Sequence, residues 1–306
     1  MKKLLSAALA ALLLTLTACS PAAPAESAAA DSTLHILATT YPVYLFTTAV
    51  TDGVEGVDVS LLVNSQTSCL HDYTLTTTDM KAIEKADVIV MNGVGLEAFM
   101  DDALATSQAP VIDCSSGVSL LPYEGHEDHD HEESEEAGDH YDPHIWMSPD
   151  NAVQMMQSIR DGLSAQLPQA EQQMTDNVVQ ADTRFMEEIP ALSASLSQRG
   201  LITFHDGFQY FSKAFDLNLL KAIEEEEGSE ASASDIQEIV SLIRQYNIPD
   251  IFTDKNGSTA TADAIARETG VKVYQLDMIM SGNGSGLQPY LDAMNANINT
   301  ISEAFQ

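Results

Sequence analysis

The residues best suited to chemistry are histidines, and most of them stand in or beside one stretch of the chain. Residues 124–140 form an acidic tract, EGHEDHDHEESEEAGDH, which holds four histidines. The motif Asp142-Pro143-His144-Ile145-Trp146 follows almost directly and contains the single Trp of the sequence. Imidazole and carboxylate groups together are typical ligands of divalent transition metals. This stretch therefore predicts metal binding, and its two parts predict different kinds of site.

The acidic tract has low complexity and cannot build a core, so it is either a plain solvated loop or an arm that holds metal ions loosely. We expect accessory, labile metal binding at His126, His129, His131 and His140. The second part differs because Pro143 and Trp146 indicate an ordered loop. A single His beside a Trp is more often structural than a ligand, so His144 needs partners from elsewhere in the chain.

Candidate partners stand where predicted strands end. His71 follows a strand at 58–63, His205 directly follows Phe204 and Asp277 directly follows Leu276. Ligands bind beyond the carboxyl ends of strands in parallel sheets, so these side chains can converge with His144. Taken singly, each also fits a surface loop, a turn or a helix cap. Together, three imidazoles and one carboxylate would form a four-coordinate zinc site.

The elements that must position these residues alternate between strand and helix. Apolar runs predict strands at 34–39, 58–63, 87–92 and 110–113, and again at 201–204, 217–222, 249–253 and 271–276. Helical patterns lie between them, at 42–52, 76–86, 96–106, 206–215, 234–246, 258–269 and 286–305. Strand–helix–strand units at this spacing form parallel sheets. The predicted fold is α/β, with an N-terminal lobe at 33–165 and a C-terminal lobe at 200–306.

One helical segment at 166–199 is expected to join the lobes rigidly, with the metal site in the cleft between them. Its apolar residues fall three or four positions apart and share one helix face: Met174, Val178, Ala181, Phe185, Ile189, Leu192 and Leu196. Pro190 should kink this helix or mark a break in it.

The N-terminus carries a targeting signal. Met1-Lys2-Lys3 is basic, residues 4–16 are mostly apolar, and Leu16-Thr17-Ala18-Cys19 has the form of a bacterial lipobox. We therefore predict a lipoprotein signal at 1–19, lipidation of Cys19, and an extracytoplasmic protein anchored to the cell membrane. Residues 20–32 are rich in Ala, Pro and Ser, which predicts a flexible tether.

Net charge and cysteine content narrow the range of possible functions further. The formal net charge of −33 argues against nucleic-acid binding and favours attraction of cations. An oxidising compartment would permit a disulfide between Cys69 and Cys114, although spacing alone cannot show that they are close.

The motifs, in this order, resemble those of the zinc- and manganese-type substrate-binding lipoproteins of bacterial ABC importers, the cluster A-I group. The likeness extends from about Leu34 to the C-terminus. It is carried by His71-Asp72-Tyr73, Asp142-Pro143-His144-Ile145-Trp146 with Ser148-Pro149, the segment FHDGFQYF at 204–211, and Leu276-Asp277. Two positions depart from the family pattern: Leu70 stands where Pro is usual, and Met278-Ile279 follows the last motif in place of Pro-Leu.

The resemblance implies a monomeric protein that holds a metal between two lobes and delivers it to a permease driven by an ATPase. It implies His71, His144, His205 and Asp277 as ligands, although water or a different carboxylate could replace Asp277. His205 and the His-rich tract indicate Zn²⁺ as the transported ion rather than manganese, which prefers oxygen ligands. A manganese or other divalent-metal protein of the same type is the first alternative.

Two further classes of function remain as alternatives. A secreted zinc enzyme is disfavoured because the sequence has no His-Glu-x-x-His motif, and four protein ligands would leave no position for catalytic water. A surface metal buffer or adhesin would depend on the tract itself, so deletion of residues 124–140 would distinguish it.

Overall fold

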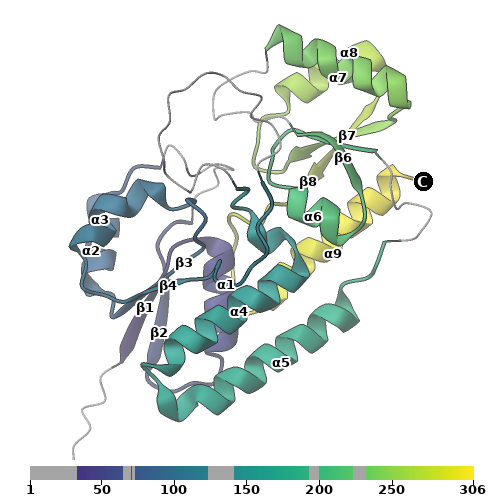
Figure 1. Ribbon diagram of the computed structural model, residues 1–306. Helices are drawn as coiled ribbons and strands as arrows, with labels where there is room; N and C mark the ends of the chain where they lie inside the picture. Colours follow the sequence, from purple (N-terminus) through teal and green to yellow (C-terminus); the bar gives the residue numbers. More distant parts are fainter. Residues whose placement is uncertain (1–32, 65–69, 71–72, 123–140, 193–199, 223–231) are drawn as a thin grey trace, which may run out of the picture. The chain divides into compact units, whose positions relative to one another are not determined.

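Two parallel sheets of four strands each form the framework of the protein (Figure 1). The computed structural model describes residues 33–64, 70, 73–122, 141–192, 200–222 and 232–306. The first sheet has the order β2-β1-β3-β4 and the second the order β6-β5-β7-β8. Every predicted strand is present, with ends shifted by one or two residues: β1 (Leu34–Ala38), β2 (Val57–Leu61), β3 (Val88–Met91), β4 (Val111–Asp113), β5 (Gly200–Thr203), β6 (Asn218–Ala222), β7 (Asp250–Asp254) and β8 (Lys272–Leu276).

Burial explains which strands lie at the sheet centres. In the first sheet, β3 carries three fully buried apolar residues in a row, and it pairs with both β1 and β4. In the second sheet all five residues of β7 are buried, and β7 pairs with β5 and β8. Near-continuous apolar runs are typical of parallel strands that helices cover on both faces. The predicted α/β fold class is therefore confirmed.

The described helices are α1 (Tyr41–Val50), α2 (Thr77–Lys85), α3 (Asp101–Thr106), α4 (Pro149–Ser164), α5 (Glu171–Glu188), α6 (Gln209–Ala214), α7 (Ala233–Tyr246), α8 (Ala260–Thr269) and α9 (Gln288–Ala304). Short 3₁₀ turns span Ala98–Met100, Ile145–Met147 and Pro168–Ala170. Thr76 and Asp79 form a capping box at α2, and Ser232 and Asp235 form one at α7.

The joining segment differs from the predicted single helix at 166–199. Helix α5 ends at Glu188, two residues before Pro190, because a proline within the next turn cannot continue the hydrogen-bond ladder. Met174, Val178, Ala181 and Phe185 are buried as expected. Ile189 and Leu192 lie beyond the helix, and Leu196 lies outside the described residues. The break at Pro190 is confirmed, and a continuous strut across the predicted range is wrong.

Helix α4, which sequence analysis did not identify, packs beside α5 and α1 (Figure 1). Its start carries clear signals, since Ser148 caps the helix through Asn151 and Pro149 stands at the first position. Its buried residues are Ala152, Met155, Met156, Ile159 and Leu163. The helix matters for the site because the 142–146 motif leads directly into it.

One hydrophobic core extends through both lobes, and residues 33–306 form one compact unit. Phe208 and Phe211 of the C-terminal lobe belong to the same buried cluster as Ile36 and Val90 of the first sheet. A second, smaller core around Ile202 and Ile265 lies within the C-terminal lobe alone. A shared close-packed interior resists deformation, so we expect little hinge motion between the lobes.

Two findings concern the membrane and cysteine predictions. None of the described helices is both long and apolar enough to cross a bilayer. Cys114 is buried and carries a free thiol, whereas Cys69 lies outside the described residues, so their pairing stays a prediction.

Candidate metal centre

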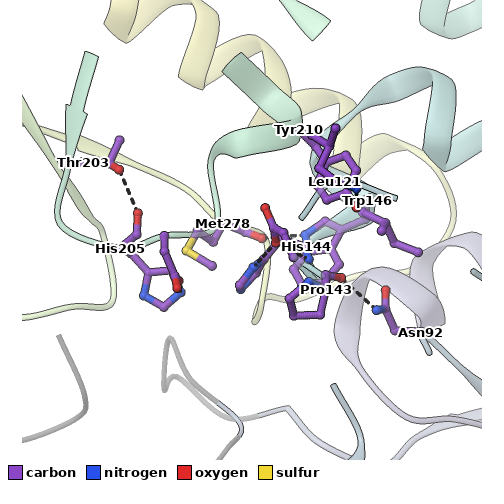
Figure 2. A network of polar contacts seen from close by, with 12 residues as sticks. Asn92, Leu121, Pro143, His144, Trp146, Thr203, His205, Tyr210 and Met278 are labelled. Carbon is purple, nitrogen blue, oxygen red and sulfur yellow. Dashed lines mark hydrogen bonds and ion pairs between the residues drawn. The ribbon is translucent and has the colours of Figure 1, made fainter. Parts of the chain in front are cut away.

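His144 and His205, far apart in the sequence, meet in the structure. Their ring centroids lie 5.4 Å apart and the rings are nearly perpendicular, at 88°. Along the chain, His144 lies between β4 and α4, and His205 lies two residues beyond β5. Figure 2 shows the two side chains. Both are buried, with 5% and 6% of their surface exposed. The structure thus brings these two imidazoles together, and their role as metal ligands stays a prediction.

Asp142 fixes the orientation of the His144 ring. Its Oδ1 atom accepts hydrogen bonds from the backbone N and from Nδ1 of His144, each at 2.8 Å. A carboxylate that holds one ring nitrogen leaves the other as the metal-binding atom and raises its basicity. The Nε2 atom of His144 is therefore the available ligand. The motif carries a ligand and its supporting carboxylate two residues apart.

Three further bonds hold the loop that carries His144, and the one between Asn92 and Pro143 is visible in Figure 2. Asn92, which follows β3, donates from Nδ2 to the backbone oxygen of Pro143 at 2.9 Å. Trp146 donates from Nε1 to the backbone oxygen of Met278 at 2.8 Å, and Tyr290 donates to the oxygen of Trp146 at 2.7 Å. The unique Trp thus ties the loop to the C-terminal lobe. These bonds explain how a loop residue can hold a fixed position.

The His205 segment is shaped by a close backbone approach. Thr203 donates from its hydroxyl to the backbone oxygen of His205 at 2.8 Å. Two residues on, Gly207 faces both His144 and Met278. A Cβ at Gly207 would lie 2.9 Å from Cδ2 of His144 and 2.5 Å from Cε of Met278. Only glycine allows the two histidine segments to pack this closely.

Asp206 joins the two histidines, a role that sequence analysis missed. Among the described residues, His144, His205 and Asp206 form a group whose ligand-type atoms all lie within 4.8 Å of one another. One oxygen of Asp206 lies 3.5 Å from Nε2 of His205, and the other is buried without a hydrogen-bond partner. A buried, unsatisfied carboxylate oxygen is costly unless something binds it. Adjacency to His205 was the signal that could have revealed it.

Buried carboxylates make this region electronegative. Burial by itself lowers the pKa of His144, but the hydrogen bond and negative charge of Asp142, with the nearby Asp206 and Asp254, outweigh it and raise the pKa above its ordinary value. Burial chiefly, and also the charge of Asp277, raises the pKa of Asp254 to about 6. Concentrated negative charge with little water around it attracts a cation.

Asp277, the fourth predicted ligand, is engaged elsewhere. Its Oδ2 atom pairs with the ammonium of Lys255, and its Oδ1 atom accepts a bond from the backbone N of Ile279 at 2.7 Å. It does not belong to the group formed by His144, His205 and Asp206. Its role as a ligand stays a prediction.

The other predicted site residues lie outside the described residues. These are His71, the four histidines of the acidic tract and Cys19. Residues on either side of His71 are described: Leu70 is buried, and the backbone N of Tyr73 donates to the oxygen of Leu70 at 3.0 Å.

The described ligand groups suit a cation that accepts both nitrogen and oxygen ligands. Two imidazoles and one carboxylate, buried and oriented by neighbours, are ligand types that zinc accepts readily. A purely oxygen-coordinated ion such as Mg²⁺ or Ca²⁺ would find too few oxygens here. The centre therefore fits capture of a divalent transition metal.

Comparison with known proteins gives a consistent picture. The family model described as "Zinc-uptake complex component A periplasmic" matches residues 36–304. Among curated relatives, the zinc-binding protein AdcA of Streptococcus pyogenes is 28% identical over 297 residues, covering 90% of this chain and 57% of that protein. The zinc-binding lipoprotein AdcA of Streptococcus pneumoniae is 29% identical over 284 residues, covering 90% and 56%. The chain thus spans little more than half the length of these relatives.

Solved structures share the fold. A ZnuA crystal structure has a TM-score of 0.74 at 24% identity and covers 90% of this chain and 100% of its own. Zn(II)-bound AdcA from Streptococcus pneumoniae has a TM-score of 0.69 at 24% identity, covering 90% and 58%. A mutant of the laminin-binding adhesin Lmb from Streptococcus agalactiae has a TM-score of 0.73 at 24% identity, covering 89% and 99%.

Proposed function

Because the chain belongs to the family of periplasmic zinc-uptake complex component A proteins, we propose that it is the zinc-binding component of an ABC importer. It captures Zn²⁺ outside the cytoplasm and delivers it to a membrane permease that an ATPase drives. The single observation that carries this proposal is the meeting of His144 and His205 in a buried group with Asp206. The printed names of the AdcA relatives support zinc as the ion.

The proposed ligands are His71, His144, His205 and a carboxylate. Asp277 is the family-type candidate for the fourth position, and Asp206 is the carboxylate that the structure places beside the two histidines. Zinc prefers nitrogen ligands more than manganese does, so a site with three imidazoles favours zinc. Protein ligands that fill the zinc coordination shell leave no open position for a catalytic water, which suits a carrier rather than an enzyme.

The remaining features act in delivery. Lipid on Cys19 would anchor the domain to the bacterial cell membrane, and residues 20–32 would tether it near the permease. The acidic tract at 124–140 would raise the local concentration of cations and exchange them quickly. The protein would act as a monomer.

The decisive experiment is a zinc-loaded crystal structure with an anomalous scan at the zinc edge. We expect an ion bonded to His144 and His205 at about 2.0–2.1 Å. Deletion of residues 124–140 should leave this ion in place, and His144→Ala or His205→Ala should remove it. Loss of all tight zinc binding in the deletion variant would instead favour a metal buffer based on the tract. A site that binds manganese more tightly than zinc would contradict the proposed cargo.

A further inference from the structure

Lys255 and Asp277 occupy neighbouring strand ends beside the candidate metal centre. Lys255 directly follows β7 and Asp277 directly follows β8, and these strands pair in register up to Asp254 and Leu276. The backbone N of Lys255 donates to the oxygen of Leu276 at 2.9 Å. This bond fixes the start of the lysine side chain, and its ammonium group pairs with Oδ2 of Asp277.

The backbone of Asp277 is held firmly, so only its side chain is free to change partner. Asn297 of α9 contacts it twice: Oδ1 of Asn297 accepts from the Asp277 N at 2.7 Å, and Nδ2 donates to the Asp277 O at 2.8 Å. Of the two carboxylate oxygens, Oδ1 is bonded to the backbone N of Ile279. Oδ2 is therefore the oxygen that can exchange the Lys255 ammonium for a metal ion.

Asp277 lies at the edge of the metal centre, because the next residue, Met278, packs on Gly207 and accepts a hydrogen bond from Trp146 at its backbone oxygen. Asp254 is buried, and its charge acts on the pKa of His144 while the charge of Asp277 acts on the pKa of Asp254. The charge of Asp277 also reaches Tyr41 of α1, whose pKa is raised first by burial and then by that charge. The carboxylate thus lies among groups from both lobes. Its side chain is 17% exposed, and that of Lys255 is 41% exposed.

We propose that Lys255 is an internal competitor for the captured metal, because its ammonium occupies the Asp277 oxygen that the metal needs. This inference rests on the proposed function and on Asp277 as a ligand. A carboxylate oxygen cannot serve the ammonium and a divalent ion at full strength together. Zinc must displace Lys255 when it binds, and Lys255 recaptures Asp277 when zinc leaves. The lysine therefore lowers zinc affinity and speeds release toward the permease.

Replacing this lysine by a neutral residue gives the competition a measurable signature. Removal of its charge leaves Asp277 without a cation partner beside the buried Asp254. Two carboxylates without a cation repel each other, and a bound zinc ion relieves that repulsion. Zinc affinity should then rise and its dissociation should slow.

The test is a double-mutant cycle on the full chain with Zn²⁺ as the probe. Affinity is measured by competition with a chromophoric chelator tight enough to strip loosely held ions, and dissociation by stopped-flow transfer to excess chelator. Lys255→Met should raise zinc affinity about two- to fivefold, the range expected when a partly exposed ion pair is removed. In the Asp277→Asn background, Lys255→Met should have no further effect.

Lys272→Met is the matched control. Lys272 is the first residue of β8, the strand that ends just before Asp277. The Lys272→Met variant therefore loses the same charge as Lys255→Met, but at the opposite end of the sheet. It should change zinc affinity less than twofold.

Two outcomes would overturn the proposal while leaving the function intact: unchanged zinc affinity in Lys255→Met, or the same gain with and without Asp277. The first would mean that the ion pair is only structural, and a lower thermal midpoint of that variant would support this reading. Failure of the proposed function would look different. In that case wild-type affinity would equal that of His144→Ala, whatever residue stands at position 255.

Discussion

One oxygen of Asp142, Oδ1, accepts hydrogen bonds from both the backbone and the ring of His144. It lies 2.8 Å from the backbone N and 2.8 Å from the ring Nδ1. The two residues are separated only by Pro143, whose fixed φ limits the shapes that this turn can take. The ring is therefore oriented before any metal arrives. Preorganisation of this kind lowers the entropic cost of binding.

Asp142→Asn should weaken zinc binding about 10- to 100-fold, the usual effect of removing a carboxylate that supports a ligating histidine. The asparagine keeps the size of the side chain but loses the charge that favours a proton on Nδ1. Zinc affinity measured by chelator competition tests this expectation. Asp150→Asn, at an exposed position in the first turn of α4, is the control and should have little effect. Equal affinities in the two variants would contradict the role given to Asp142.

Zinc affinity should fall as pH decreases, beginning above the ordinary histidine pKa of 6.5. The pKa of His144 is raised because the carboxylates around it outweigh burial, so protons compete with zinc already near neutral pH. Each ligand proton that zinc must displace costs about tenfold in affinity per pH unit below its pKa. Titrations between pH 8 and pH 5 measure the slope. In Asp142→Asn the fall should begin at lower pH, and a flat profile in wild type would argue against imidazole ligation.

The framework could be read from the sequence because its signals are local. Apolar runs placed all eight described strands, and their spacing gave two parallel sheets. The four family motifs gave the family, which the match over residues 36–304 confirmed. The convergence of His144 and His205 followed from the rule that parallel sheets bind ligands at their carboxyl ends.

The details that were missed depend on tertiary contacts. The partners of Asp277 could not be read from the sequence, because Lys255 lies 22 residues away and meets it only when β7 and β8 pair. The closeness of Asp206 to His144 likewise depends on the fold, in which Gly207 lets the two histidine segments pack together. Helix α4 is the exception, because its signals are local: Ser148 caps it and Pro149 stands at its first position, so it could have been predicted. The end of α5 was placed too late because its apolar spacing continues past Pro190.

Glu97 is a buried carboxyl that connects the first sheet to the His144 loop. It accepts hydrogen bonds from the Thr39 hydroxyl at 2.7 Å and from the backbone N atoms of Asn92 and Gly93 at 2.7 and 3.1 Å. Asn92 in turn holds the oxygen of Pro143. Burial raises the pKa of Glu97 to about 7, although these bonds partly oppose the shift. Glu97 therefore binds a proton in the folded state at pH values where the unfolded chain has lost it.

This raised pKa predicts that Glu97 favours folding below about pH 4.5 and that the advantage is lost as pH rises to about 7. The full change is on the order of 3 kcal/mol, since one pKa unit corresponds to about 1.4 kcal/mol. Glu97→Gln should be less stable than wild type near pH 5, because the amide cannot accept the bond from Gly93. The difference should shrink toward pH 8. Urea unfolding at several pH values measures it, with exposed Glu84→Gln as the control. A difference that does not vary with pH would contradict the raised pKa.

Gly207→Ala tests whether the metal centre depends on close approach of the two histidine segments. The added methyl would lie within 3.0 Å of the His144 ring and closer still to the end of Met278. Met278 can move its flexible terminus, but His144 is held by Asp142 and cannot yield without losing that bond. We expect a loss of about 1–3 kcal/mol in stability, typical of overpacking a buried site. We also expect a loss of zinc affinity that exceeds any change in Gly257→Ala, where the added atom meets only ordinary contacts. Full zinc affinity in Gly207→Ala, together with a lowered thermal midpoint, would show that the approach of these segments serves packing and not metal capture.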